Sequence, residues 1–124
     1  MILKADPTPA HSLQHQEGAA LRLPWYPVLV RGPSMVPTVR DGDVLLVRRG
    51  GARVRPGDVV VARFRARPEL PVVKRAVRRE GTGWWLIGDN AYVTDDSRAY
   101  GVADVEGKVL MRWWPRPGRL SRVR

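Results

Sequence analysis

The sequence lacks cysteine altogether, has no long apolar run and contains only two histidines. Without cysteine, neither disulfide bonds nor thiolate metal sites can form. The most apolar stretch, residues 21–30, is far shorter than the roughly 18 apolar residues of a membrane-spanning helix, and it contains Pro24 and Pro27. Residues 1–18 have charged and polar side chains where a signal peptide would need an apolar centre. We therefore expect a cytoplasmic protein without a transmembrane segment.

The charge of the chain is strongly basic, with a formal net charge of +10 in 124 residues. Such a charge attracts nucleic acid, anionic membranes or acidic proteins. The basic residues are spread along the chain and are not gathered in one run with spaced aromatic residues. We therefore do not expect nucleic acid as the partner, and contact between the basic termini and a membrane stays open.

Lysine is scarce, because 19 of the 22 basic residues are arginines and only Lys4, Lys74 and Lys108 are lysines. A lysine can lose its proton when it is removed from water, whereas arginine stays charged. Lys74 lies inside the apolar stretch 71–77, which reads as a strand. It is the lysine best placed for proton transfer. The alternative is an edge-strand lysine that faces solvent and prevents aggregation.

The pattern of apolar residues predicts a single all-β domain, small and barrel-like or built from several sheets. Residues 89–104 read as a long polar loop, and no segment of helical length has a 3.6-residue apolar period. Residues 67–69 are expected to close a hairpin, and the third strand is expected to be central because both its faces are apolar. The predicted strands are residues 23–30, 44–48, 59–65, 70–78, 84–87 and 105–113.

The two ends of the chain differ in composition from this domain. Residues 1–20 read as a mobile N-terminal arm and residues 115–124 as a basic tail. His11 and His15 have a spacing that would suit a metal only on a formed helix, so we expect no metal there.

Ser34 lies on a turn that follows the apolar run 27–30. Gly32 and Pro33 precede it and Pro37 follows, so the backbone on either side is constrained. A stiff turn that presents one hydroxyl is suited to a nucleophile, although a proline-rich surface turn has the same composition. A serine nucleophile also needs a base. Both histidines lie in the expected arm, which leaves carboxylates or the amine of Lys74.

Four segments, taken in order, resemble the motifs of the signal peptidase I family of serine–lysine proteases. They are residues 34–38 (SMVPT), 57–61 (GDVVV), 73–75 (VKR) and 88–101 (GDN followed by DSR and Gly101). The resemblance implies the catalytic-core fold shared by signal peptidase and LexA, with the peptidase domain at residues 21–114. It also implies that Ser34 is the nucleophile and supplies a backbone oxyanion donor, and that Lys74 is the general base.

The resemblance assigns supporting roles to four further residues. The hydroxyl of Thr94 would hold the amine of Lys74, in place of a serine that is usual in the family. Asp96 and Arg98 would form an ion pair that stiffens the loop beneath the site. Gly32 stands where some members have a serine that adds a second oxyanion donor. The chemistry that the family uses requires no cofactor and no metal.

Within the family, the short form with Trp84 beside Trp85 and Trp113 beside Trp114 is most similar to proteases proposed to mature nickel-type superoxide dismutase. The implied partner is a precursor protein from which an N-terminal leader is removed. Three alternatives stay open: preprotein processing of the signal peptidase I type, a self-cleaving regulator of the LexA type, and a non-catalytic basic module that binds nucleic acid.

Overall fold

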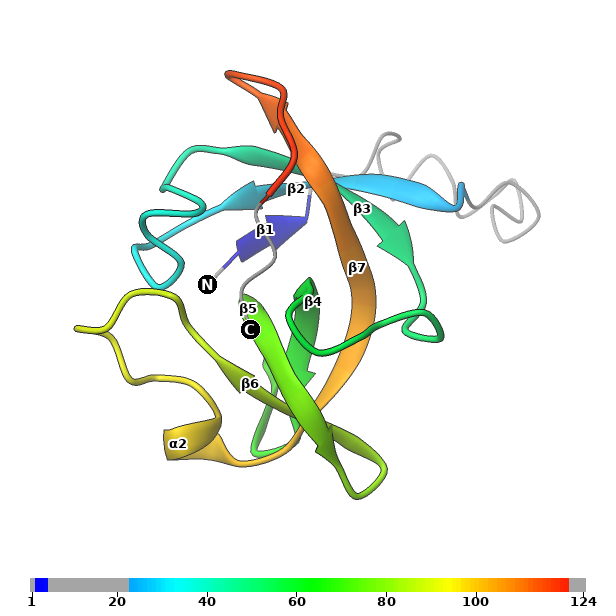
Figure 1. Cartoon of the computed structure of the whole chain (residues 1–124), viewed down its shortest axis with the longest axis vertical. Helices are drawn as coiled ribbons and strands as arrows, with labels where there is room; N and C mark the ends of the chain where they lie inside the picture. Colours follow the sequence, from blue (N-terminus) through cyan, green and yellow to red (C-terminus); the bar gives the residue numbers. More distant parts are fainter. Residues whose placement is uncertain (1, 5–22, 121–124) are drawn as a thin grey trace.

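The computed structural model describes residues 2–4 and 23–120, and almost all of its regular structure is β-strand (Figure 1). A single turn of helix, α2, spans Ser97–Tyr100. The strands are β1 (Ile2–Lys4), β2 (Trp25–Val30), β3 (Val44–Arg49), β4 (Val59–Phe64), β5 (Arg67–Glu80), β6 (Gly83–Ile87) and β7 (Ala103–Trp114).

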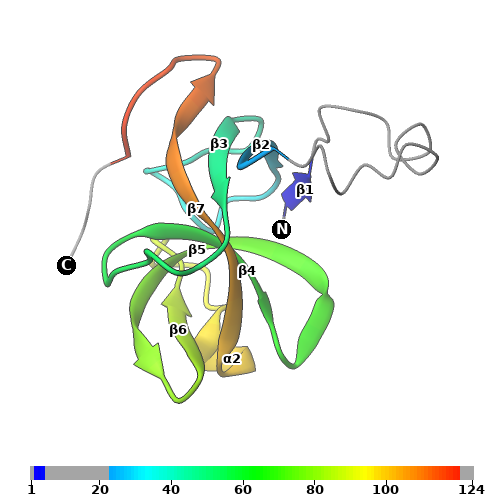
Figure 2. The same ribbon diagram turned by 90° about the vertical axis from the view of Figure 1, so that its right-hand side faces the viewer.

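All seven strands belong to one antiparallel sheet in the order β1-β2-β3-β7-β4-β5-β6. The long strand β7 pairs with β3 through its C-terminal half and with β4 through its N-terminal half. It therefore runs through both parts of the molecule, with β2 and β3 in one part and β4, β5, β6 and α2 in the other (Figure 2). An additional pairing of Trp84 in β6 with Ala103 in β7 closes the second part into a small barrel.

The core consists of two hydrophobic clusters that meet at β4. Val59 and Val61 belong to the first cluster, together with side chains of β2 and β3, and Val60, Ala62 and Phe64 belong to the second. Because successive side chains of a strand point to opposite faces, β4 buries one face in each cluster. This accounts for its unbroken apolar sequence and confirms the prediction of a central strand.

The all-β class is confirmed, and most strand bounds lie within two residues of those expected, whereas the start of β5 and the segment that holds α2 differ more. Strand β5 begins at Arg67, which pairs with Phe64, so residues 67–69 are part of the strand and do not close the hairpin. The turn lies at residues 65–66. Helix α2 lies within the stretch expected to be an irregular loop, because the Asp96 side chain accepts from the N–H of Arg98 and caps the helix.

The ends of the chain are described only in part. Residues 2–4, expected in a mobile arm, form β1 and pair with β2, whereas His11 and His15 lie outside the described residues. In the expected tail, Gly118 pairs with Arg112 of β7. Within residues 2–4 and 23–120, the structure contains no helix of the length and apolarity that crossing a membrane would require.

Candidate active site

Ser34 lies on a tight turn that joins β2 to β3. Gly32 has a φ angle of +94°, a backbone conformation that favours glycine, and its N–H donates to Asp41 Oδ1 at 2.9 Å. The N–H of Gly32 thus stabilises the turn. On either side of this turn, the N–H of Val30 donates to the carbonyl of Asp43 at 2.8 Å, so the two strands are joined where they leave the turn. The geometry confirms a constrained turn at Ser34.

The Ser34 turn has exposed prolines, Pro33 and Pro37, but is anchored in the core through the serine and the residues that follow it. The Ser34 residue is only 8% exposed, and Met35 and Val39, which follow it, are fully buried in the first cluster. The N–H of Val39 donates to the carbonyl of Met35 at 3.0 Å. The turn is thus proline-rich and partly at the surface, as the alternative expected, but burial of Met35 and Val39 fixes the position of the serine backbone.

Residues 88–90 clamp the same turn from the opposite direction. The N–H of Asn90 donates to the Ser34 carbonyl at 2.9 Å, and its side-chain amide donates to the Pro33 carbonyl at 3.0 Å. Gly88 lies so close that a Cβ atom there would be 2.7 Å from the Ser34 carbonyl oxygen. A glycine at 88 is thus required by the approach of the two backbones.

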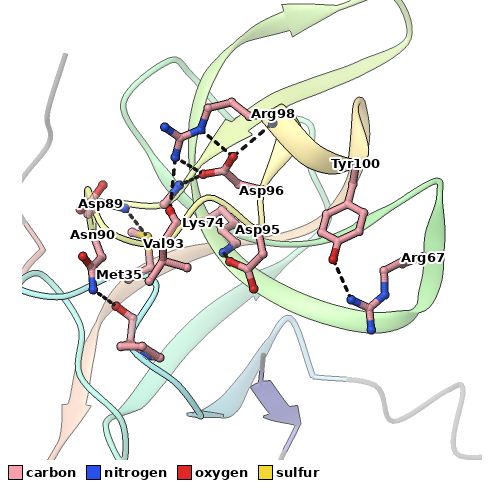
Figure 3. Close-up of polar contacts among 12 residues, drawn as sticks. Met35, Arg67, Lys74, Asp89, Asn90, Val93, Asp95, Asp96, Arg98 and Tyr100 are labelled. Atoms are coloured by element: carbon pink, nitrogen blue, oxygen red, sulfur yellow. Dashed lines mark hydrogen bonds and ion pairs between the residues drawn. The ribbon is translucent and has the colours of Figure 1, made fainter.

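Lys74 is buried on β5, the strand next to β6 at one end of the sheet order. It lies on β5, between β4 and β6, with Val60 as its register partner, and its side chain is 1% exposed. Its amine is 3.3 Å from Oδ1 of Asp95 (Figure 3). The alternative of a solvent-facing edge lysine is therefore wrong.

The register of β5 and β6 brings Lys74 and Ser34 to one place. Arg75 pairs with Ile87, the last residue of β6, so the residues that come next on the two strands, Lys74 and Gly88, are neighbours. Gly88 in turn contacts the Ser34 backbone. The hydroxyl and the amine, which are forty positions apart in the chain, thus belong to segments that meet at Gly88.

The loop residue that contacts the Lys74 amine is Asp95, which the sequence analysis did not single out. Thr94, its neighbour, is exposed, and its assigned role in holding the amine stays a prediction. The signal in the sequence was a second acidic residue directly before Asp96. Only the path of the loop shows that this first carboxylate reaches the lysine.

Asp96 and Arg98 form the expected ion pair. The Arg98 guanidinium donates to both carboxylate oxygens of Asp96, at 2.9 and 2.7 Å, and the N–H of Gly88 donates to Asp96 Oδ2 at 2.9 Å (Figure 3). Burial of Asp96 acts to raise its pKa, but the hydrogen bonds from Arg98 and Gly88 outweigh this effect and hold the pKa below its ordinary value. The pair therefore ties the start of α2 to the glycine that contacts the serine.

A second ion pair, between Arg75 and Asp89, was not foreseen. Arg75 Nη2 lies 2.5 Å from Asp89 Oδ2, which also accepts from the hydroxyl of Thr38. The N–H of Asp89 donates to the sulfur of Met35 at 3.3 Å. Asp89 thereby joins the serine segment, the lysine strand and the loop that begins at Gly88. Each of these residues lies in one of the four motifs, but sequence spacing cannot show that they share one carboxylate.

The chemistry available at this site is that of a hydroxyl and an amine. A buried lysine amine and a constrained serine, on segments that meet at Gly88, are the two components that a nucleophile–base pair requires. Among residues 2–4 and 23–120, histidine and acidic side chains form no group of three or more that could hold a metal ion.

Comparison with known proteins gives this site a family context. The sequence profile described as Peptidase S24-like matches residues 19–110, a range that contains Ser34, Lys74 and the loop after β6. Mitochondrial inner membrane protease subunit 1 of Xenopus tropicalis is 32% identical over 114 residues, which cover 71% of this chain and 68% of that protein. Mitochondrial ATP-independent inner membrane protease subunit 1a of Arabidopsis thaliana is 34% identical over 115 residues, covering 69% and 68%. The subunit 1 protein of Schizosaccharomyces pombe is 31% identical over 121 residues, covering 77% of each chain.

Proposed function

The chain belongs to the Peptidase S24-like family, and on this premise we propose that it is a serine endopeptidase in which Lys74 is the general base for Ser34. The observation that carries the proposal is the burial of Lys74 on β5, next to Gly88. Gly88 in turn contacts the Ser34 backbone. A lysine is expensive to bury, and a functional site is a common reason for it.

The proposed reaction uses the amine twice. The uncharged amine of Lys74 takes the hydroxyl proton of Ser34 as Oγ attacks the carbonyl carbon of the scissile bond. The tetrahedral intermediate collapses to an acyl-enzyme ester, and the amine returns the proton to the leaving nitrogen. Water then attacks the ester carbonyl and loses a proton to Lys74. When the bond between the carbonyl carbon and Oγ breaks, Lys74 returns this proton to Oγ, so the Ser34 hydroxyl and the uncharged amine are regenerated. The N–H of Ser34 is the proposed donor to the oxyanion.

The edge of β5 ahead of Lys74 offers a place for an extended peptide substrate. Strand β6 pairs with residues 75–80 of β5, so the stretch of β5 that leads up to Lys74 lies beyond the end of β6. Peptides commonly bind by adding a strand to such an edge. We expect a substrate with small side chains before the cleaved bond, as the family resemblance implies.

For the substrate we propose a precursor protein that carries an N-terminal leader, with the precursor of nickel-type superoxide dismutase as the first candidate. The support for this candidate is the resemblance in sequence to the short maturation proteases, including the paired tryptophans. Trp113 and Trp114 are exposed at the end of β7, and Trp84 is buried in the second cluster.

Preprotein processing of the signal peptidase type is the second candidate. It is favoured by the relatives named as mitochondrial inner membrane proteases, which are 31–34% identical to this chain. The two candidates differ in substrate and not in chemistry, so one set of variants tests the mechanism for both.

The test is to mix the purified protein with each precursor and to measure the masses of the products. We expect cleavage of one precursor at a single bond, and loss of cleavage in Ser34→Ala and in Lys74→Arg. The matched control is Lys108→Arg, which changes a lysine on β7 that pairs with Asp58 at 3.3 Å and should leave cleavage intact. Circular dichroism and thermal unfolding establish that each variant is folded. Turnover by Lys74→Arg would contradict the base role, since arginine stays charged.

A further inference from the structure

An exposed carboxylate reaches a buried amine at the candidate site. Oδ1 of Asp95 lies 3.3 Å from the Lys74 amine, and the two side chains are 60% and 1% exposed, respectively. Asp95 lies on the loop between β6 and α2, and Figure 3 shows its side chain directed at the amine. The contact thus joins a residue held in the sheet to a residue at the surface.

The other charged groups on the elements beside Lys74 contact different partners. Along β5, Arg75 has its side chain on the opposite face of the sheet, because successive residues of a strand alternate. The carboxylates of β5 pair along the strand, Glu69 with Arg67 and Glu80 with Arg78. Those of the adjoining segments pair as follows: Asp58, ahead of β4, with Lys108; Asp89, after β6, with Arg75; and Asp96, ahead of α2, with Arg98. Asp95 is therefore the carboxylate whose charge acts most directly on the amine.

A carboxylate at this distance favours the charged form of an amine, whereas a general base must be uncharged. Resting on the proposed function, we infer that Asp95 is a positioning residue that holds Lys74 in its protonated form in the free protein and gates its use as a base. Displacing or neutralising Asp95 releases the amine for proton transfer from Ser34.

The two partners differ in their freedom to move. Lys74 is enclosed by the sheet and cannot leave without opening the core. Asp95 is mostly in solvent, so its side chain can turn away at little cost. The gate therefore operates by movement of Asp95, and a peptide that binds along β5 toward Lys74 approaches the place where this side chain lies.

The first test is the dependence of kcat/KM on pH in the wild-type protein and in Asp95→Asn. We expect the acid limb of the profile to move toward lower pH by roughly half a unit, the size expected for an ion pair with one exposed member. At pH values on the acid limb, kcat/KM of the variant should be about threefold that of the wild type, and on the plateau the two values should be equal. Added salt should move the wild-type limb toward that of the variant, because salt screens the exposed charge.

The matched control is Asp104→Asn. Asp104 is also an exposed aspartate in an ion pair, with Arg65 at 2.8 Å, and it lies at the start of β7 outside the candidate site. Its substitution should leave the acid limb in place. A shift of equal size in both variants would show a general effect of net charge and would overturn the inference.

The second test reads the lysine directly and does not need a substrate. Lysine labelled with 13C at Cε gives three signals, since the chain has three lysines, and Lys74→Arg identifies the one from Lys74. In Asp95→Asn the Lys74 signal should titrate at lower pH than in the wild type, while the other two signals are unchanged. An unchanged Lys74 titration would overturn the gating role. If the wild type cleaves no precursor while this titration still shifts, the proposed function fails and the contact between the two side chains is upheld.

Discussion

Replacement of Gly88 by alanine tests whether close approach of the loop to the serine turn sets the active geometry. The added Cβ would be 2.7 Å from the Ser34 carbonyl oxygen, 0.7 Å short of an ordinary contact at 3.4 Å. Both sides of this contact are held, because Gly88 donates to Asp96 at 2.9 Å and the Ser34 carbonyl accepts from Asn90 at 2.9 Å. A shift of that size would stretch one of these hydrogen bonds beyond its normal range.

We expect Gly88→Ala to reduce both the stability of the fold and the rate of cleavage. Overpacking of this kind destabilises a protein by about 1–3 kcal/mol. Displacing a nucleophile by a fraction of an ångström to one ångström can reduce the rate on the order of 10²-fold. We expect Gly88→Ala to lower the urea midpoint at unchanged slope and to reduce kcat more than it raises KM.

The control for this substitution is Gly118→Ala. The atom nearest to a Cβ at this position is 3.5 Å away, on the side chain of Arg112, so the methyl group fits without strain. It should leave stability and activity close to those of the wild type. Wild-type stability and turnover in Gly88→Ala would refute the view that this contact fixes the serine.

Three further predictions concern stability. The pKa of Asp96 is lower in the folded protein than in the unfolded chain, so its ionised carboxylate stabilises the fold fully at pH values above its unfolded pKa. This stabilisation is lost as the pH falls through its folded pKa, so Asp96→Asn should flatten the acid side of a plot of Tm against pH. Burial and a nearby carboxylate raise the pKa of Tyr26 to about 12, so stability should fall above about pH 10, and Tyr26→Phe should remove this slope. Thr38→Val removes the hydrogen bond to Asp89 and should cost about 1 kcal/mol in urea unfolding.

The parts of the fold that follow from local sequence could be predicted. Gly32, Pro33 and Pro37 indicate a turn, because glycine can adopt backbone angles that other residues avoid and proline fixes its own, and the turn is there. The apolar residues on both faces of β4 indicate a central strand, since each face must be buried. The pairing of Asp96 with Arg98 was implied by the family resemblance, because both residues lie in its last motif, and the structure contains this pair.

What could not be predicted depends on contacts between distant segments. Asp89 joins Thr38 and Arg75, and no spacing in the sequence shows that a loop carboxylate will meet both. Asp95 was missed for the same reason, because the side chain that faces Lys74 is decided by the path of the loop and by the cap at Asp96. The start of β5 was misplaced because Pro68 and Glu69 read as a turn, whereas pairing of Arg67 with Phe64 extends the hairpin.

Strand β4 has a consequence for how the enzyme loses its structure. Its alternating side chains form part of both hydrophobic clusters, and Met35 and Val39 beside the serine belong to the first, while Val60 opposite Lys74 belongs to the second. If either hydrophobic cluster unfolds, β4 is displaced and the other cluster loses the β4 side chains that complete it. Heating or denaturant should therefore separate Ser34 from Lys74 in one cooperative transition, and a partly unfolded form that retains either half alone should not accumulate.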